Sequence, residues 1–350
     1  MRGNESHQEE MFACGGLGER ISETHPVRRI RALTDEVLAE LRSELEAMYA
    51  ATGRPSIPPE QMLRALLLQM LYTVRSERRL VEQMQYDLLF RWFIGLGWNG
   101  AAWDASSFSK NRERLLSGKI AAKFLQAVVS RARAEHLLDD ERFSVDGTLI
   151  EAWASEKSYQ RRSGPPPDKG SGAVLLADTH ESRTDPEARL YRKGVASGWK
   201  LRHMAHAVSD NQHGLVVATG VSTCSSKAER HAALDMARQL GGAARVMGAD
   251  KGYHEQDFVE GLRQMGIQAH VPPYARRRTR CWVDPALYQQ PEYAESQRKR
   301  KWIERFFSWL KTSAGMRKTR HRGHRKLDWN FTFAAAAYNL IRMSRLLAAV

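Results

Sequence analysis

The feature that most constrains the fold is a change in hydrophobic periodicity near residue 140. Between residues 28 and 116 the apolar residues recur at helical spacing, in short stretches separated by turn residues. From Phe143 to Ile150 apolar and polar residues alternate instead, as they do in a strand. A single layer architecture does not accommodate both patterns, so we expect an all-helical part followed by a part built on a sheet.

The second part has the pattern of an α/β domain. After the strand at 143–150, two alternating stretches joined by a short polar turn predict a hairpin, and helices and strands then follow one another. These elements are expected at 200–209, 214–222, 228–240, 243–249, 254–265, 267–271, 300–311 and from 331. A hairpin followed by alternating helices and strands is the order of an RNase H-like fold with a mixed sheet.

We expect three regions along the chain. Residues 1–25 carry little pattern and are expected to form a loose N-terminal arm, and residues 26–120 a helical N-terminal domain. Short helices with tight turns are compatible with a helix-turn-helix-like DNA reader and equally with a packing or dimerisation domain, and both possibilities stay open. Residues 140–350 are expected to form the RNase H-like domain, with a loop insertion at 155–199 that begins rich in Pro and Gly.

Composition limits the class of protein. The 350 residues are 42% hydrophobic and 27% charged, which is typical of a globular chain with a substantial core. The three cysteines are far apart, which argues for a reducing compartment and against a disulfide frame or a thiolate zinc site. The apolar stretch at 331–350 is interrupted by Arg342 and Arg345, and the N-terminus lacks a signal-like apolar segment. We therefore expect a cytoplasmic protein with no membrane contact.

Positive charge is concentrated in one segment. The chain carries a net charge of +14, and residues 276–326 hold 16 Lys and Arg against four acidic residues, a local net charge of +12. Charge runs are usually solvated surface, but this one is interleaved with aromatic residues such as Trp302 and Phe306. That combination favours a polyanion as the partner, and nucleic acid in particular.

Three acids stand at informative positions in this part of the chain. Asp146 and Asp250 each follow a short apolar run that is expected to end at the aspartate, and Glu304 lies on the polar face of the helix at 300–311. Each also has an ordinary interpretation. Asp146 could belong to an Asp-Gly turn, Asp250 could cap the following helix, and Glu304 could be a surface partner of Arg300.

Together the three acids predict a site for divalent cations. Carboxylate oxygens are the ligands that Mg²⁺ and Mn²⁺ prefer, and a pair of ions suits phosphoryl transfer. Arg300 and Lys311, at four and seven residues from Glu304, would then hold DNA phosphates, and we add Arg298, Lys299, Arg305 and Lys318 as expected contacts. His203 and His206 alternate faces of a strand, and His321 and His324 lie in a basic loop, so neither pair is expected to bind metal. No ATP-binding or dinucleotide motif is present.

Three segments and one residue spacing resemble those of the DDE transposases of bacterial insertion sequences. The segments are 146–153 (DGTLIEAW), 182–191 (SRTDPEARLY) and 248–253 (GADKGY), and the spacing is that of Arg300, Glu304 and Lys311. The family's third motif has a Tyr where this chain has Gln297. Residues 54–116 are similar to the InsH-type N-terminal domain of the same group. The resemblance covers about residues 30–345.

The resemblance implies an enzyme that cuts DNA at the terminal inverted repeats of a mobile element and joins the 3′-hydroxyl to target DNA. It implies that Asp146, Asp250 and Glu304 hold two Mg²⁺ or Mn²⁺ ions. The expected partners are double-stranded DNA and further copies of the chain, and the expected location is the bacterial nucleoid. Two alternatives remain: an RNase H-like nuclease without strand transfer, and an inactive DNA-binding repressor copy.

Overall fold

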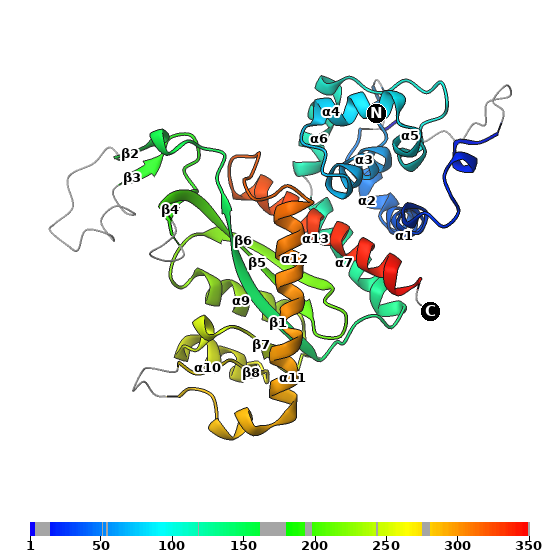
Figure 1. Ribbon diagram of the computed structural model, residues 1–350. Coiled ribbons are helices and arrows are strands. Elements are labelled where there is room, and N and C mark those ends of the chain that lie inside the picture. The colour runs from blue at the N-terminus through cyan, green and yellow to red at the C-terminus, as the bar shows by residue number, and fades with distance from the viewer. Residues whose placement is uncertain are drawn as a thin grey trace. The chain divides into compact units, whose positions relative to one another are not determined.

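The computed structural model describes residues 1–3, 15–50, 52–53, 55–117, 119–161, 180–192, 198–242, 244–274 and 281–348. The chain divides into two compact units, a helical unit and a sheet unit (Figure 1). The helical unit comprises Met1–Leu137, Trp309–Gly315 and Thr332–Val350, and the sheet unit comprises Leu138–Ser308 and Met316–Phe331. The helices α12 (Lys301–Thr312) and α13 (His324–Leu346) each contribute residues to both units. The expected boundaries at 25, 120 and 140 stay a prediction, and much of the expected arm and of the 155–199 insertion lies outside the described residues.

Short helices make up the N-terminal part of the helical unit, as the periodicity predicts. They are η1 (Leu17–Arg20), α1 (Pro26–Glu40), α2 (Arg42–Ala47), α3 (Pro59–Leu71), α4 (Glu77–Tyr86), α5 (Leu88–Ile94), α6 (Ala105–Ser117) and α7 (Ile120–Ala134). Ser76 caps α4, because its hydroxyl accepts a hydrogen bond from the Arg79 N–H at 3.1 Å. Asp104 caps α6 by accepting from the N–H groups of Ser106 and Ser107, both at 2.9 Å.

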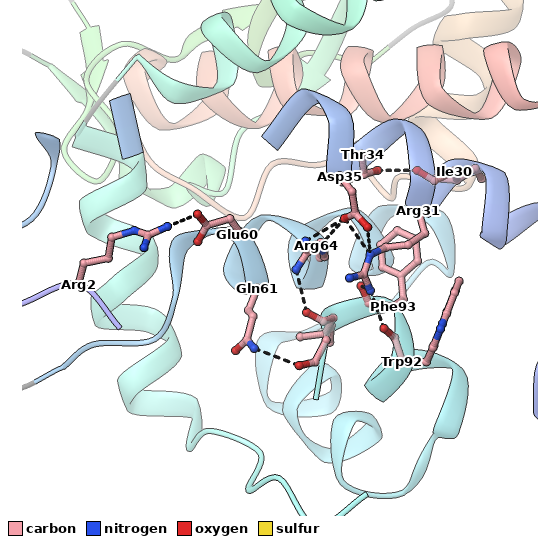
Figure 2. A network of polar contacts seen from close by, with 12 residues as sticks. Arg2, Ile30, Arg31, Thr34, Asp35, Glu60, Gln61, Arg64, Trp92 and Phe93 are labelled. Atoms are coloured by element: carbon pink, nitrogen blue, oxygen red, sulfur yellow. Dashed lines mark hydrogen bonds and ion pairs between the residues drawn. The ribbon is translucent and has the colours of Figure 1, made fainter. Parts of the chain in front are cut away.

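A network of paired charges lies inside the helical unit (Figure 2). Asp35 of α1 receives Arg31 from its own helix and Arg64 from α3, at N–O distances of 2.7 and 2.8 Å. Arg64 is only 4% exposed, and its remaining donors reach the carbonyl of Ile94 at 3.3 Å. Arg31 also donates to the Trp92 carbonyl at 2.6 Å. The network therefore fixes α1, α3 and the end of α5 to one another.

The sheet unit is built on a six-stranded mixed sheet. Its strands are β1 (Arg142–Glu151), β4 (Arg189–Tyr191), β5 (Lys200–Asp210), β6 (Val216–Thr223), β7 (Val246–Gly248) and β8 (Gln268–His270), in the order β4-β5-β1-β7-β8 with β6 also paired to β5. β5 runs antiparallel to β1 and β6, whereas β1, β7 and β8 run parallel. This topology, an antiparallel hairpin joined to parallel strands, is that of the predicted RNase H-like fold. A separate ribbon joins β2 (Tyr159–Arg161) and β3 (His180–Ser182) within the expected insertion.

Helices cover both faces of this sheet. α9 (Ala228–Gln239) packs on β5, β6 and β1, and α10 (Gln256–Gln264) packs on α9 and β8 (Figure 1). Phe143 and Val145 of β1 point into the core that these helices share. On the other face, a Cβ added to Gly248 would lie 3.1 Å from the Ser144 hydroxyl and 2.9 Å from that of Ser296 in α11 (Pro291–Lys299). Among the described residues, no helix is long and apolar enough to span a membrane.

Candidate active site

Asp146 lies in the middle of β1 rather than at its end. The strand continues from Phe143 to Glu151 because every residue in that stretch is paired with β5. The expectation that the strand closes at Asp146 is therefore wrong, and so is the Asp-Gly turn. The half-buried carboxylate bends back along the strand, and its Oδ1 accepts a hydrogen bond from the Gly147 N–H at 2.8 Å.

Asp250 follows directly on the strand next to β1. In the parallel pairing of β1 and β7, Ser144 stands opposite Gly248. Continuing that register by two residues puts Asp250 level with Asp146, on strands that are separated by about 4.8 Å. The Asp250 carboxylate also caps the 3-10 turn η3 (Lys251–Tyr253), accepting from the Gly252 N–H at 2.7 Å. The capping interpretation and the position at the sheet edge are therefore both correct.

Glu304 lies on α12, which forms where the helix at 300–311 is predicted, and belongs to its first turn. Its side chain is 54% exposed, and Oε1 is 3.4 Å from the Arg300 guanidinium, so the surface-partner interpretation holds as well. Within the described ranges, no three His, Cys, Asp or Glu side chains converge closely enough to hold a metal ion. Asp146 lies on β1 and Asp250 two residues beyond the neighbouring β7, and Glu304 does not converge with them into such a group.

A buried tyrosine ends the turn η3. Tyr253 is 1% exposed, and its phenol oxygen has no hydrogen-bond partner among the described residues. Burial raises the pKa of Tyr253, and the negative charges of Glu229, Asp146 and Asp250 raise it further, in that order. Tyr253 closes the motif at 248–253 but is not among the expected site residues, and neither is Glu229.

The expected DNA-contacting cations differ in their surroundings. Arg298 is exposed and Lys299 half-buried, and the exposed Arg305 stacks on the Trp302 ring with its guanidinium 4.3 Å from the centroid. The exposed Lys318 forms a similar contact with Trp153, at 5.8 Å. Lys311 is half-buried and belongs to the part of α12 that is assigned to the helical unit.

The motif at 182–191 anchors the segment that follows α12. The buried Asp185 accepts from the Gly323 N–H at 3.3 Å, and its other oxygen is 3.1 Å from His203 Nε2 of β5. Glu187 accepts from the His324 N–H at 2.7 Å and lies 3.3 Å from that ring. His203 and His324 pair with these carboxylates, and His206 Nε2 lies 2.7 Å from the Ser222 hydroxyl.

Gln297 occupies the position where the resemblance predicts a tyrosine. Its side-chain amide donates to the His270 carbonyl at the end of β8, at 2.6 Å. The residue therefore ties α11 to the parallel edge of the sheet, and its contact is with the backbone.

Two family profiles match separate ranges of the chain. Residues 16–114 match a transposase domain (DUF772), and residues 139–340 match a transposase DDE domain. No curated protein matches the sequence. Two solved structures, a pre-cleavage Mos1 transpososome and a Mos1 transposase paired-end complex with the left transposon end, align over 86% of this chain and 81% of theirs at 11% identity. Their TM-scores of 0.21 and 0.20 are too low to establish a shared arrangement.

Proposed function

This chain belongs to the DDE transposase family and is a transposase, and we propose that Asp146, Asp250 and Glu304 form its catalytic centre. The reaction is the cleavage of DNA strands at the ends of a mobile element and the joining of those ends to target DNA. The observation that supports the assignment is the parallel register of β1 and β7, which pairs Ser144 with Gly248 and, carried on by two residues, would put Asp250 level with Asp146. Acids on adjacent parallel segments can act on one phosphate group.

The donors proposed for this site suit a hard divalent cation. Asp146 and Asp250 supply carboxylate oxygens. Oxygen donors of this kind favour Mg²⁺ or Mn²⁺ over softer metals. When bound, two such ions would activate the attacking oxygen and stabilise the leaving one. In this proposal Asp146 and Asp250 hold the ions and Glu304 supplies a third carboxylate.

The basic residues around α12 are proposed to hold the DNA backbone. Arg298, Lys299, Arg300, Arg305, Lys311 and Lys318 would each contact phosphate, and the stacking of Arg305 on Trp302 holds one of these guanidinium groups in place. Because phosphate contacts release counterions, binding should weaken steeply with salt. Replacing Lys318 with Ala should reduce the slope of log K against log salt by about one, without changing sequence preference.

The test of the assignment uses DNA that carries the sequences flanking this reading frame. Asp146→Asn should abolish strand cleavage in Mg²⁺ while DNA binding stays measurable. A matched control is Asp235→Asn, which removes the same charge from an exposed site on α9 that pairs with Arg238 at 2.5 Å. Full cleavage by Asp146→Asn would overturn the assignment.

The same assay separates the alternative functions. Ends that are cut but never joined would indicate a nuclease without strand transfer. Binding of the correct ends with no cleavage by the unmodified chain would indicate a repressor copy.

We further propose that copies of the chain assemble, since two element ends must be cut and joined together, and light scattering with and without end DNA tests this. A DNA partner would associate the protein with the nucleoid.

A further inference from the structure

Two acids of the motif at 182–191 bind the backbone of a basic segment, and the proposed catalytic centre does not use them. Asp185 Oδ1 accepts a hydrogen bond from the Gly323 N–H at 3.3 Å. Glu187 Oε2 accepts one from the His324 N–H at 2.7 Å, and its other oxygen lies 3.3 Å from the ring of that histidine. Acids two residues apart thus bind two consecutive amides.

The backbone at Gly323 is suited to this contact. Its φ of +80° lies in the left-handed region, which glycine adopts without strain. A Cβ added to Gly323 would lie 3.0 Å from Glu187 Oε2, which is closer than side chains normally approach. Any other residue would therefore strain the turn and press on the carboxylate that binds the next amide.

Asp185 is itself fixed to the sheet. Its side chain is fully buried, and Oδ2 lies 3.1 Å from Nε2 of the fully buried His203 on β5. The Asp185 N–H donates to the Ser182 hydroxyl at 3.0 Å. A buried carboxylate is costly unless donors surround it, so these contacts hold Asp185 in one place. The Gly323 amide is thereby tied to a strand that pairs with β1.

Backbone hydrogen bonds fix the other end of this segment to β1. The Glu151 N–H donates to the Arg317 carbonyl at 3.1 Å, and the Glu151 carbonyl accepts from the Thr319 N–H at 2.8 Å. Lys318 therefore stands opposite Glu151 in a parallel bridge. Residues 316–325, which we call the clamped segment, are thus held near both ends.

The clamped segment exposes basic side chains and contains no acidic residue. Its buried side chains are those of Met316 and Thr319. Its exposed basic residues are Arg317, Lys318, Arg320, Arg322 and Arg325. So many like charges on one short segment repel one another, and a polyanion that lies across them offsets that repulsion.

Capping of α13 alone does not account for this arrangement. Acids near the start of a helix are favoured by the helix dipole, and Asp185 and Glu187 meet α13 where it begins. A cap, however, is normally supplied by the residue just before the helix. Here the two acids come from positions 138 and 137 residues away, and the segment they hold is also paired with β1.

We propose that the motif at 182–191 positions the clamped segment as a preformed contact for the DNA backbone, with Asp185 and Glu187 as positioning residues. Cations that are held in place before binding spare the entropy of ordering a loop on DNA. The acids act through the segment and do not touch DNA themselves.

The position of this contact relative to the cut rests on the proposed function, because it takes Asp146 as a catalytic residue. Glu151 lies five residues beyond Asp146 on β1, a distance of about 17 Å at the rise of a strand. With about 3.4 Å between successive phosphates along the axis, the clamped segment should meet the DNA about five base pairs from the cut.

The test measures binding of duplex end DNA by the full chain without divalent ions. The Glu187 side chain is 51% exposed, so Glu187→Ala spares the core. In about 0.1 M salt it should lower the affinity at least about tenfold and reduce the slope of log K against log salt by about two. Removing an acid beside DNA would by itself strengthen binding, so the direction of the change identifies positioning. Asp235→Ala, which removes an exposed acid from α9, should not weaken binding.

Two further variants separate positioning from a folding defect. Glu187→Gln keeps an oxygen for the His324 N–H and should restore binding. Gly323→Ala leaves every acid and cation in place but strains the turn, so it should weaken binding as Glu187→Ala does. Phosphate ethylation interference should show that Glu187→Ala and Gly323→Ala lose the contacts about five base pairs from the cut and keep the others.

The outcomes distinguish this proposal from the proposed function. If Glu187→Ala and Gly323→Ala bind end DNA as the unmodified chain does, the positioning role is overturned, whatever Asp146→Asn does. Uniform loss of all phosphate contacts that Glu187→Gln does not restore would also overturn it, because the motif would then hold the fold. If the local contacts are lost but Asp146→Asn still cleaves, the positioning role stands and the proposed centre is overturned.

Discussion

The helical unit and the sheet unit place acidic side chains in different surroundings. In the helical unit Arg64 is buried, and Asp35 and a backbone carbonyl receive its donors, so opposite charges are matched (Figure 2). In the sheet unit the half-buried Asp146 and Asp250, which we propose as catalytic acids, accept hydrogen bonds from backbone N–H groups. We call these two residues the collected acids, and a bound cation would offset the repulsion between their charges.

This difference separates residues that hold the fold from residues that act. Breaking a matched pair should lower stability with no effect on cation binding. Neutralising a collected acid should leave stability unchanged or raise it, and should remove function.

The largest effect is expected from Asp35→Ala in the helical unit. The substitution leaves Arg64, which is 4% exposed, without its carboxylate, and an unpaired buried charge costs about 3 kcal/mol. Chemical denaturation, with hydrogen exchange of α3 as a local probe, measures the loss. Asp235→Ala breaks an exposed pair and should cost at most about 0.5 kcal/mol. Equal losses from the two variants would remove the contrast between the units.

The next effect is a dependence of stability on pH in the sheet unit. Burial lowers the pKa of His206 and that of His270 to about 4, below the ordinary value of 6.5. Because the unfolded chain takes up these protons first, stability is complete above pH 6.5 and falls as the pH drops towards 4. The loss should reach about 2–3 kcal/mol for His206 alone.

Hydrogen exchange tests this prediction in each unit separately. Amides of β1 and β5 should lose protection between pH 6.5 and 5, whereas amides of α3, which the Asp35–Arg64 ion pair ties to α1, should keep theirs. His206→Gln, which can retain the bond to Ser222, should flatten the response of the sheet unit. Parallel losses of protection in both units would contradict the interpretation.

A smaller effect of opposite sign is expected when the collected acids are neutralised. Asp146→Asn and Asp250→Asn keep an oxygen for the Gly147 and Gly252 N–H groups and remove a negative charge beside Tyr253. Each should raise the free energy of unfolding by about 0.5–1 kcal/mol without divalent ions. Thermal denaturation at low and high salt measures the gain, which should shrink as screening increases. A clear destabilisation would place these aspartates among the residues that hold the fold.

Much of this fold follows from local pattern, because the determining signals are short in range. The alternation at 200–223 predicts the hairpin of β5 and β6, and the cap at Ser76 marks the start of α4. Some boundaries do not follow. Asp104, Ser106 and Ser107 are all residue types that cap helices, and the structure selects Asp104. The helical periodicity between residues 28 and 116 does not reveal the break at Leu41 between α1 and α2, and it ends before α7.

The sequence likewise predicts some parts of the candidate site and misses others. Asp250 was placed correctly because β7 is an uninterrupted run of buried residues that ends just before it. Asp146 was misplaced because Asp-Gly favours a turn locally, and pairing with β5 overrides that preference. Tyr253 closes the motif at 248–253, but no local pattern predicts that it is buried, and no motif includes Glu229. The place of Glu229 depends on the packing of α9 against β1, which no spacing in the chain encodes.

The smallest change in stability is expected for Glu304→Gln. Glu304 is exposed and pairs with the half-buried Arg300 four residues earlier, so the substitution should change the free energy of unfolding by no more than about 0.5 kcal/mol. If Glu304 acts with the collected acids, cleavage of end DNA should nevertheless fall by orders of magnitude, while Glu292→Gln on α11 leaves it unchanged. Loss of stability without loss of cleavage would show that Glu304 supports the fold through its pair with Arg300 and takes no part in catalysis.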